Sequence, residues 1–449
     1  MDDLSRRSFL GRSARSVFVF SAASISTARR PLHSTSANEK VQIAAIGVGG
    51  RGSSLIRGFV DRKDCAIPMI GDLDPSRGAQ LVDYCAKKQG VKPERVLDYR
   101  RVLDSKDVDA VTVATPDHWH GPMTIYACQA GKDVYVEKPP SHNVWEGRKM
   151  VEASRHHKQI VQVGTQNRSA AYVKKALEYI QGGGLGKIHL CKVYNLKSGG
   201  PYRAPVDTSA PKGLDYDTWL GPAPKRSFNR GHFHGLWHNY WRYSGGDMAD
   251  DGVHQLDIAR WLTGVDFPTK ISGSGGNYAF DDDREPPDTQ VVSFTFPKMV
   301  MTFELTQYAG YMRKTNGQTR NGSKFPFWPQ NATRIELYGS KNLMIIGRHG
   351  GGWQVFTGEG KAIAQEFGRF PDPPHKADFV DAVKTRRRPN ADIEEGHRSA
   401  CLVHLGNIST RLGRSLAFDK KSERVVGDPE AQRLVKRSYR APFTIPDVF

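Results

Sequence analysis

Residues 41–52, VQIAAIGVGGRG, decide the fold of this chain of 449 residues. A short apolar run at 41–46 opens into three glycines with the G-x-G-x-x-G spacing. In a strand–turn–helix unit, the first glycine permits the tight turn, the second lets the backbone approach a pyrophosphate, and the third lets the helix pack close to the strand. The stretch therefore predicts a dinucleotide-binding βαβ unit. Its phosphate-binding residues would be Gly47, Gly49, Gly50, Arg51 and Gly52.

A second apolar stretch, CAIPMIGDLD at 65–74, is typical of a buried strand that ends in an acid, Asp72. A carboxylate at this distance from the glycine turn accepts hydrogen bonds from ribose hydroxyls and would repel a 2′-phosphate. We therefore expect NAD, with NADP less favoured. An ordinary βαβ unit with a glycine turn is the alternative that the motif leaves open.

The overall composition excludes several classes of protein. The net charge is +18, but patches such as KTRRRP at 384–389 are more typical of solvated surface, and no nucleic-acid-binding motif occurs. The sequence contains no run of eighteen or more apolar residues, the length that a membrane-spanning helix needs. The five cysteines are widely spaced without a C-x-x-C, which argues against a disulfide framework and a structural zinc site.

The first 33 residues resemble a twin-arginine signal peptide. SRRSFL at 5–10 is followed by a short apolar stretch at 17–23 and by small residues at 26–28. A basic tail is the alternative. A signal of this type would send the folded protein through the twin-arginine translocon to the periplasm or beyond, without a stable membrane anchor. We therefore expect the cofactor to be tightly bound during export.

After the first 33 residues, the pattern of predicted strands and helices changes twice along the chain. Between 40 and 166, apolar strands alternate with helical segments, which predicts a doubly wound parallel sheet of the Rossmann type. From 167 to 415, helices near 171–181, 250–263, 375–386 and 394–412 accompany antiparallel strands within 289–308 and 333–347. The aromatic stretch at 197–246 is too long for a simple connector and predicts a functional loop. Residues 416–449 are expected to form a C-terminal arm.

Two segments would end strands at the cofactor edge of the sheet. In ATPDHWH at 114–120, Thr115 and Pro116 would line the cofactor and His120 would reach the nicotinamide ribose. His118 and His120 also have the spacing of a metal pair, but no partnering cluster is visible, so no metal is expected.

In YVEKPP at 135–140, Pro139 restricts Lys138 to an extended backbone that directs its side chain into the cleft. Next to a nicotinamide cation, the lysine would have a lowered pKa and would act in proton transfer. Glu137 would lie at the same edge. A plain surface lysine is the alternative.

A third segment, GGDMADDGVHQLDIARWL at 245–262, places Asp250, His254 and Asp257 on one face if it is helical. A carboxylate and an imidazole on one face form a plausible acid–base unit. A buried histidine with helix-capping aspartates is the alternative.

Taken in this order, the three motifs resemble those of the Gfo/Idh/MocA family (glucose-fructose oxidoreductase, inositol dehydrogenase and MocA) over about 40–415. The TPDHWH segment and WLGP at 219–222 add to the resemblance. It implies a Rossmann domain for NAD(P), followed by an α/β domain with a large, mostly antiparallel sheet. It also implies that Lys138, Asp250 and His254 are catalytic, although Asp251 is a second carboxylate in the same motif.

The resemblance implies hydride transfer between nicotinamide and a hydroxyl carbon of a sugar, cyclitol or glycoside. A redox-neutral glycoside hydrolase or lyase that acts through a transient keto-sugar is the alternative, and a non-enzymatic sugar-binding protein is a third interpretation. The family also suggests a homodimer or homotetramer. The expected substrate-binding residues are Arg168, Trp237, Trp241 and Tyr243, although the two tryptophans would also suit a core.

Overall fold

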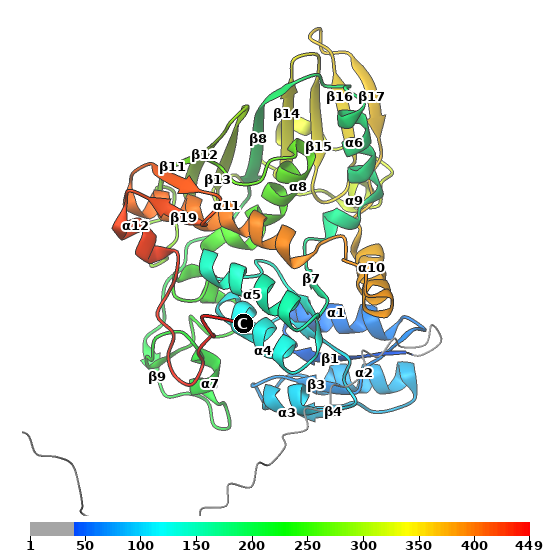
Figure 1. The fold of residues 1–449 in the computed structure, drawn as a ribbon, viewed down its shortest axis with the longest axis vertical. Helices are drawn as coiled ribbons and strands as arrows, with labels where there is room; N and C mark the ends of the chain where they lie inside the picture. Colours follow the sequence, from blue (N-terminus) through cyan, green and yellow to red (C-terminus); the bar gives the residue numbers. More distant parts are fainter. Residues whose placement is uncertain (1–39) are drawn as a thin grey trace, which may run out of the picture. The chain divides into compact units, whose positions relative to one another are not determined.

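The computed structural model describes residues 40–449, so the expected signal peptide at 1–33 lies outside the described residues. The first part of the described chain forms a parallel sheet, as predicted (Figure 1). Its strand order is β4 (Glu94–Val96), β3 (Met69–Gly71), β1 (Val41–Ile46), β5 (Ala110–Val113), β6 (Asp133–Val136) and β7 (Val161–Val163), with β2 (Cys65–Ala66) paired to β1. The order reverses between β1 and β5, where doubly wound sheets bind their ligands.

Helices cover both faces of this sheet, and strand β1 shows why. Ile43 and Ala45 point into one core and Ala44 and Ile46 into the other, because successive side chains of a strand alternate. The first core includes α1 (Gly50–Val60) and α2 (Ala79–Gln89). The second includes α3 (Tyr99–Asp104), α4 (Asp117–Gln129) and α5 (Val144–His156).

The second sheet has ten strands and is antiparallel except where β8 meets β13. Its order is β17 (Ala362–Glu366), β16 (Trp353–Phe356), β15 (Leu343–Gly347), β14 (Arg334–Gly339), β8 (Ile188–Leu196), β13 (Met299–Thr306), β12 (Thr289–Phe296), β11 (Lys270–Gly276), β18 (Leu416–Asp419) and β19 (Arg424–Val426). One face packs against α6 (Ala171–Gln181), α8 (Val253–Thr263) and α11 (Ile393–Leu412). The predicted fold class is thus confirmed.

Three local features differ from the sequence expectation. Strand β4 was not expected, because two of its three residues are exposed and carry no apolar pattern. The helix expected from 250 begins with a π-helical turn, Met248–Gly252, which leads into α8. The aromatic stretch contains β9 (Asp207–Thr208), α7 (Tyr216–Leu220), β10 (Phe228–Asn229) and a 3-10 turn, Leu236–Asn239.

The remaining helical elements complete the described chain. They are two 3-10 turns, Gln166–Ser169 and Trp328–Gln330, and α9 (Gly317–Arg320), α10 (Asp372–Thr385) and α12 (Pro429–Leu434). Helix α10 packs on the first sheet although it comes late in the chain. Its Phe379 contacts Phe59 and Tyr135 edge to face, with ring centroids 6.0 and 5.7 Å away.

The segment expected as a C-terminal arm has two parts. Residues up to 434 add β18, β19 and α12 to the second sheet, and the final stretch returns to the first sheet. There Phe443 and Ile445 are buried in the same core as α4, and Arg437 Nη2 donates to the His118 carbonyl at 2.6 Å. All five cysteines are free and buried. Among residues 40–449, no helix is both long and apolar enough to cross a membrane.

Candidate active site at the edge of the parallel sheet

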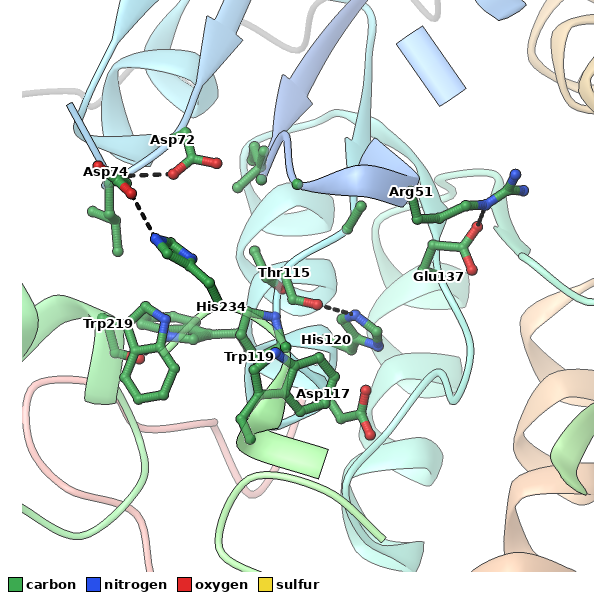
Figure 2. A pocket seen from close by; sticks show the side chains of 18 of the residues that line it. Arg51, Asp72, Asp74, Thr115, Asp117, Trp119, His120, Glu137, Trp219 and His234 are labelled. Carbon is green, nitrogen blue, oxygen red and sulfur yellow. Dashed lines mark hydrogen bonds and ion pairs between the residues drawn. The ribbon is translucent and has the colours of Figure 1, made fainter. Parts of the chain in front are cut away.

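A cavity of about 360 Å³ lies at the carboxyl ends of β1, β3, β5 and β6 (Figure 2). Its walls come from the glycine turn, from the segments after those strands, and from the aromatic stretch. The predicted cofactor residues that line it are Gly47, Gly49, Gly50, Arg51, Asp72, Thr115, Pro116, His120, Glu137 and Lys138. The sheet topology explains this gathering, because the ends of parallel strands meet at one edge.

The glycine turn leaves room for a phosphate. Gly47 has a φ of 86°, which favours glycine, and a Cβ on Gly52 would lie 2.0 Å from the Gly47 carbonyl oxygen. At Gly50, by contrast, a Cβ would meet nothing within 4 Å. Thr115 also lines the cavity, next to the glycine turn. These residues fit a dinucleotide that enters with its pyrophosphate at the start of α1.

Asp72 lies at the far end of the cavity and is held by the backbone. Its carboxylate accepts hydrogen bonds from the backbone N–H groups of Val48 at 2.8 Å and Asp74 at 2.9 Å. Asp74 in turn lies 2.6 Å from His234 Nε2, so the aromatic stretch closes over this end (Figure 2). Arg77 also lines this end, 3.8 Å from Asp74.

Lys138, which follows β6, pairs with Asp250 of the π-helical turn before α8 on another part of the cavity wall. Its Nζ donates to Asp250 Oδ1 at 2.5 Å and to the Asp250 carbonyl at 2.6 Å. Burial would lower the pKa of Lys138, but the Asp250 carboxylate outweighs it, so the net shift is upward. The same ion pair overcomes the opposing effect of burial and holds the pKa of Asp250 well below its usual range. The lowering of the Lys138 pKa that we expect next to a nicotinamide cation stays a prediction.

The π-helical turn separates the two neighbouring carboxylates of the motif. Asp250 lines the cavity, whereas Asp251 forms ion pairs with Arg348 and, at 3.3 Å, with Lys197. An extra residue in the helical turn presents consecutive side chains in directions that a regular helix would not, and such turns are frequent at functional sites. The geometry therefore brings Asp250, and not Asp251, to Lys138.

Two histidines lie near this ion pair. His254 is buried, its Nδ1 has no partner among the described residues, and it is absent from the cavity wall. Burial, followed by the charges of Arg348 and Lys138, lowers the pKa of His254 well below its usual value. His238 comes from the 3-10 turn of the aromatic stretch and lines the cavity, and burial also lowers its pKa. Both rings are therefore neutral near pH 7.

Other predicted cofactor residues are held by specific contacts. Arg51 Nε donates to Glu137 Oε1 at 2.7 Å, which ties α1 to the end of β6 (Figure 2). The two ring nitrogens of His120 lie 2.6 Å from the Pro139 carbonyl and 2.8 Å from the Thr115 carbonyl. His120 was expected to reach a ribose, but its nitrogens already face two backbone oxygens, so the ring acts as a clamp between two loops.

The substrate residues expected from the sequence are mostly elsewhere. Trp237 lines the cavity. Arg168 does not, because it is buried against Asp257 at 2.9 Å and Glu395 at 3.2 Å. Tyr243 is fully buried in an aromatic cluster, and Trp241 packs under Arg411, 4.9 Å from the ring centroid. The structure therefore corrects the assignment of Arg168, Trp241 and Tyr243, whose partners are set by tertiary contacts.

Sequence reasoning also missed residues that line the cavity. Asp117 is 2% exposed, accepts a hydrogen bond from Ser244 Oγ at 2.7 Å, and has its pKa raised to about 8 by burial. His234 and His238 lie in an irregular loop, where no periodicity marks them. Their clustering with aromatic residues at 230–243 was the available signal. Within 40–449, no group of three or more His, Cys, Asp or Glu residues is arranged to hold a metal ion.

Comparison with known proteins agrees with this geometry. Residues 41–165 match the family described as "Oxidoreductase family, NAD-binding Rossmann fold". Residues 198–276 and 330–445 match "Oxidoreductase family, C-terminal alpha/beta domain". The scyllo-inositol 2-dehydrogenase (NAD(+)) of Bacillus subtilis is 27% identical over 53% of this chain and 57% of its own length.

Two further similarities are more distant or more local. Glycosyl hydrolase family 109 protein 1 of Shewanella sp. is 32% identical over 26% of each chain. The WlbA dehydrogenase of Bordetella pertussis, solved with NADH and UDP-GlcNAcA, matches 85% of this chain and 99% of its own with a TM-score of 0.60 and 19% identity, which shows the fold. The chain spans less than two thirds of the length of its curated relatives. The two family matches together cover most of the chain, which therefore belongs to the NAD-binding Gfo/Idh/MocA family of oxidoreductases.

Proposed function

We propose that this protein transfers a hydride between NAD and a hydroxyl-bearing carbon of a sugar, cyclitol or glycoside. The Lys138–Asp250 ion pair carries the proposal, because it links the end of β6 to the turn before α8 and lines the same cavity as the glycine turn. A relative named scyllo-inositol 2-dehydrogenase supports a polyhydroxylated substrate.

Bound NAD supplies a nicotinamide ring that accepts or returns the hydride. Lys138, kept protonated by Asp250, donates a hydrogen bond to the substrate oxygen and stabilises the negative charge that develops on it. A neutral imidazole then takes the hydroxyl proton. The sequence motif assigns this step to His254, and Asp250 would hold a neighbouring hydroxyl.

To test this, a panel of sugars, cyclitols and glycosides is incubated with the protein and NAD, and the formation of NADH is measured by its nicotinamide absorbance. Lys138→Met should lower kcat by about 10²- to 10⁴-fold while NADH binding stays intact. Lys63→Met, at an exposed position, is the control. His254→Ala and His238→Ala show which imidazole takes the proton. Unchanged turnover in Lys138→Met would remove the ion pair from the chemistry.

A redox-neutral reaction is the second candidate. It is supported by the local similarity to a glycosyl hydrolase family 109 protein. The enzyme would oxidise a glycoside hydroxyl, eliminate the substituent made labile by the ketone, and then return the hydride. Release of the aglycone without added NAD and without net NADH would favour this reaction. Accumulation of NADH in proportion to the substrate consumed would favour the dehydrogenase.

We further propose that NAD is preferred over NADP and is retained. The preference is supported by Asp72, which lines the cavity and whose carboxylate would repel a 2′-phosphate. The His234–Asp74 contact, which closes the aromatic stretch over that end, supports retention. Nicotinamide absorbance released by denaturing the purified protein tests retention, and titration with both nucleotides tests the preference.

Export through the twin-arginine route and self-association are proposals of the same kind. The Arg6–Arg7 pair supports export to the periplasm, and loss of export in an Arg6→Lys, Arg7→Lys variant would test it. We propose that the outward face of β12 and β13, where Val291 is 49% exposed among threonine and serine residues, is covered in a homodimer or homotetramer. Light scattering after size-exclusion chromatography measures the assembly.

A further inference from the structure

A second cavity of about 190 Å³ lies beside the first and shares Gly235, His238 and Asp250 with it. Lys138 is bonded to Asp250, so the ion pair that meets the substrate oxygen in the proposed function lies where the two cavities join. A substrate whose reacting carbon faces the cofactor cavity would extend the rest of its ring into this second cavity, which we call the substrate chamber.

The substrate chamber is small. Complete small-molecule sites usually measure roughly 300–1,000 Å³, so about 190 Å³ suits one compact ring. A nucleotide-linked sugar would need a diphosphate and a nucleoside outside the chamber.

Two cations line the chamber, and both already have carboxylate partners. Lys197 forms ion pairs with Asp247 and with Asp251, the latter at 3.3 Å. Arg284 Nε donates to Asp282 Oδ1 at 2.9 Å, and these two side chains are only 3% and 0% exposed. A further Arg284 bond goes to the Gly200 carbonyl at 2.7 Å. Neither lining cation is therefore available to neutralise an anionic ligand.

Carboxylates that face the chamber strengthen this conclusion. Asp247 and Asp250 both line it, and a substrate carboxylate or phosphate would meet their negative charge at close range. A hydroxyl group, in contrast, donates to a carboxylate and accepts from an ammonium, so paired ions suit it. Asn239 and Gln307 add neutral hydrogen-bonding groups to the wall.

We infer that the substrate is a neutral polyol ring, such as an unsubstituted monosaccharide, a cyclitol or a simple glycoside, and that uronates, sugar phosphates and nucleotide-linked sugars are rejected. This inference rests on the proposed function. It also identifies Asp247 as a specificity-determining residue, because its carboxylate cancels the charge of Lys197.

The experiment compares isosteric ligands that differ in charge. Gluco-, galacto- and manno-configured methyl glycosides are supplied in three forms: with the C6 hydroxyl, as the C6 uronamide and as the C6 uronate. Turnover is followed by nicotinamide absorbance. Isothermal titration into NADH-loaded protein gives a second readout, independent of turnover.

For the ring that reacts fastest, we expect kcat/KM for the uronamide to exceed that for the uronate by at least tenfold, with a parallel difference in affinity. Asp247→Asn should reduce this ratio several-fold, because Lys197 is then left with Asp251 alone. Asp83→Asn, at an exposed position on α2, should leave the ratio unchanged.

Equal or better use of the uronate by the unaltered protein would overturn the inference while leaving the proposed function in place. An unchanged ratio in Asp247→Asn would overturn the role of that residue. Failure of every neutral ring both to bind and to change the nicotinamide absorbance would overturn the proposed function and the inference together.

Discussion

Replacement of Gly52 by alanine should lower the free energy of unfolding far more than replacement of Gly50 by alanine. A Cβ at Gly52 would lie 2.0 Å from the Gly47 carbonyl oxygen, and real Cβ contacts essentially never fall below 3.0 Å. Helix α1 would therefore have to move about 1 Å from the turn. Overpacking costs about 1–3 kcal/mol, and we expect the upper half of that range because the obstacle is rigid backbone.

The assay is urea unfolding combined with NADH titration. With a slope of about 2–3 kcal/mol per molar urea, a loss of about 2–3 kcal/mol lowers the midpoint by about 1 M. NADH affinity should fall at least tenfold, because the turn that faces the pyrophosphate is displaced.

Gly50→Ala is the matched control. It lies in the same turn and helix, but its Cβ would meet nothing within 4 Å, and alanine is favoured over glycine in helices by up to about 1 kcal/mol. Its midpoint should equal or exceed that of the unaltered protein. An unshifted midpoint in Gly52→Ala, or an equal loss in Gly50→Ala, would refute the steric argument.

Three further predictions follow from individual contacts. Arg168→Met should lower the free energy of unfolding by about 3–5 kcal/mol, because it leaves the buried Asp257 unpaired, and urea unfolding would measure this. Burial raises the folded-state pKa of Asp117 from 3.8 to about 8, so the folded protein binds this proton more tightly than the unfolded chain does. The stability that the bound proton contributes is complete below about pH 4 and is lost as pH rises through about 8. Asp117→Asn should therefore gain stability relative to the unaltered protein over that window, measured by urea midpoints at pH 5 and pH 9. His234→Ala should release NADH up to about fivefold faster in stopped-flow fluorescence, since the partly exposed hydrogen bond between His234 and Asp74 contributes about 1 kcal/mol. An unchanged rate would contradict its closing role.

The sequence predicted the parts of the site that depend on local pattern. The glycine turn, Asp72 and Lys138 each follow a short apolar strand, and strands of one parallel sheet end at one edge, so their meeting could be foreseen. Asp250 was reached through its motif, although the π-helical turn that separates it from Asp251 leaves no mark in the sequence.

The parts that could not be predicted depend on contacts between distant segments. Arg168 and Tyr243 carry groups that suit a sugar, but each is committed to a buried partner that only the folded chain supplies. His238 lies in a loop without periodicity, so neither its place on the cavity wall nor its neutral charge could be read from spacing. The pairing of Lys197 with Asp247 likewise joins segments fifty residues apart.

The return of residues 435–449 to the first sheet has a consequence for biosynthesis. Phe443 and Ile445 complete the hydrophobic core behind α4, and α10 covers the opposite side of that sheet. N-terminal domains usually mature while the rest of a protein is still emerging from the ribosome. Here the nucleotide-binding half must wait until residues 443–445 have been synthesised, so a chain that stops before them would lack part of the interior of that half.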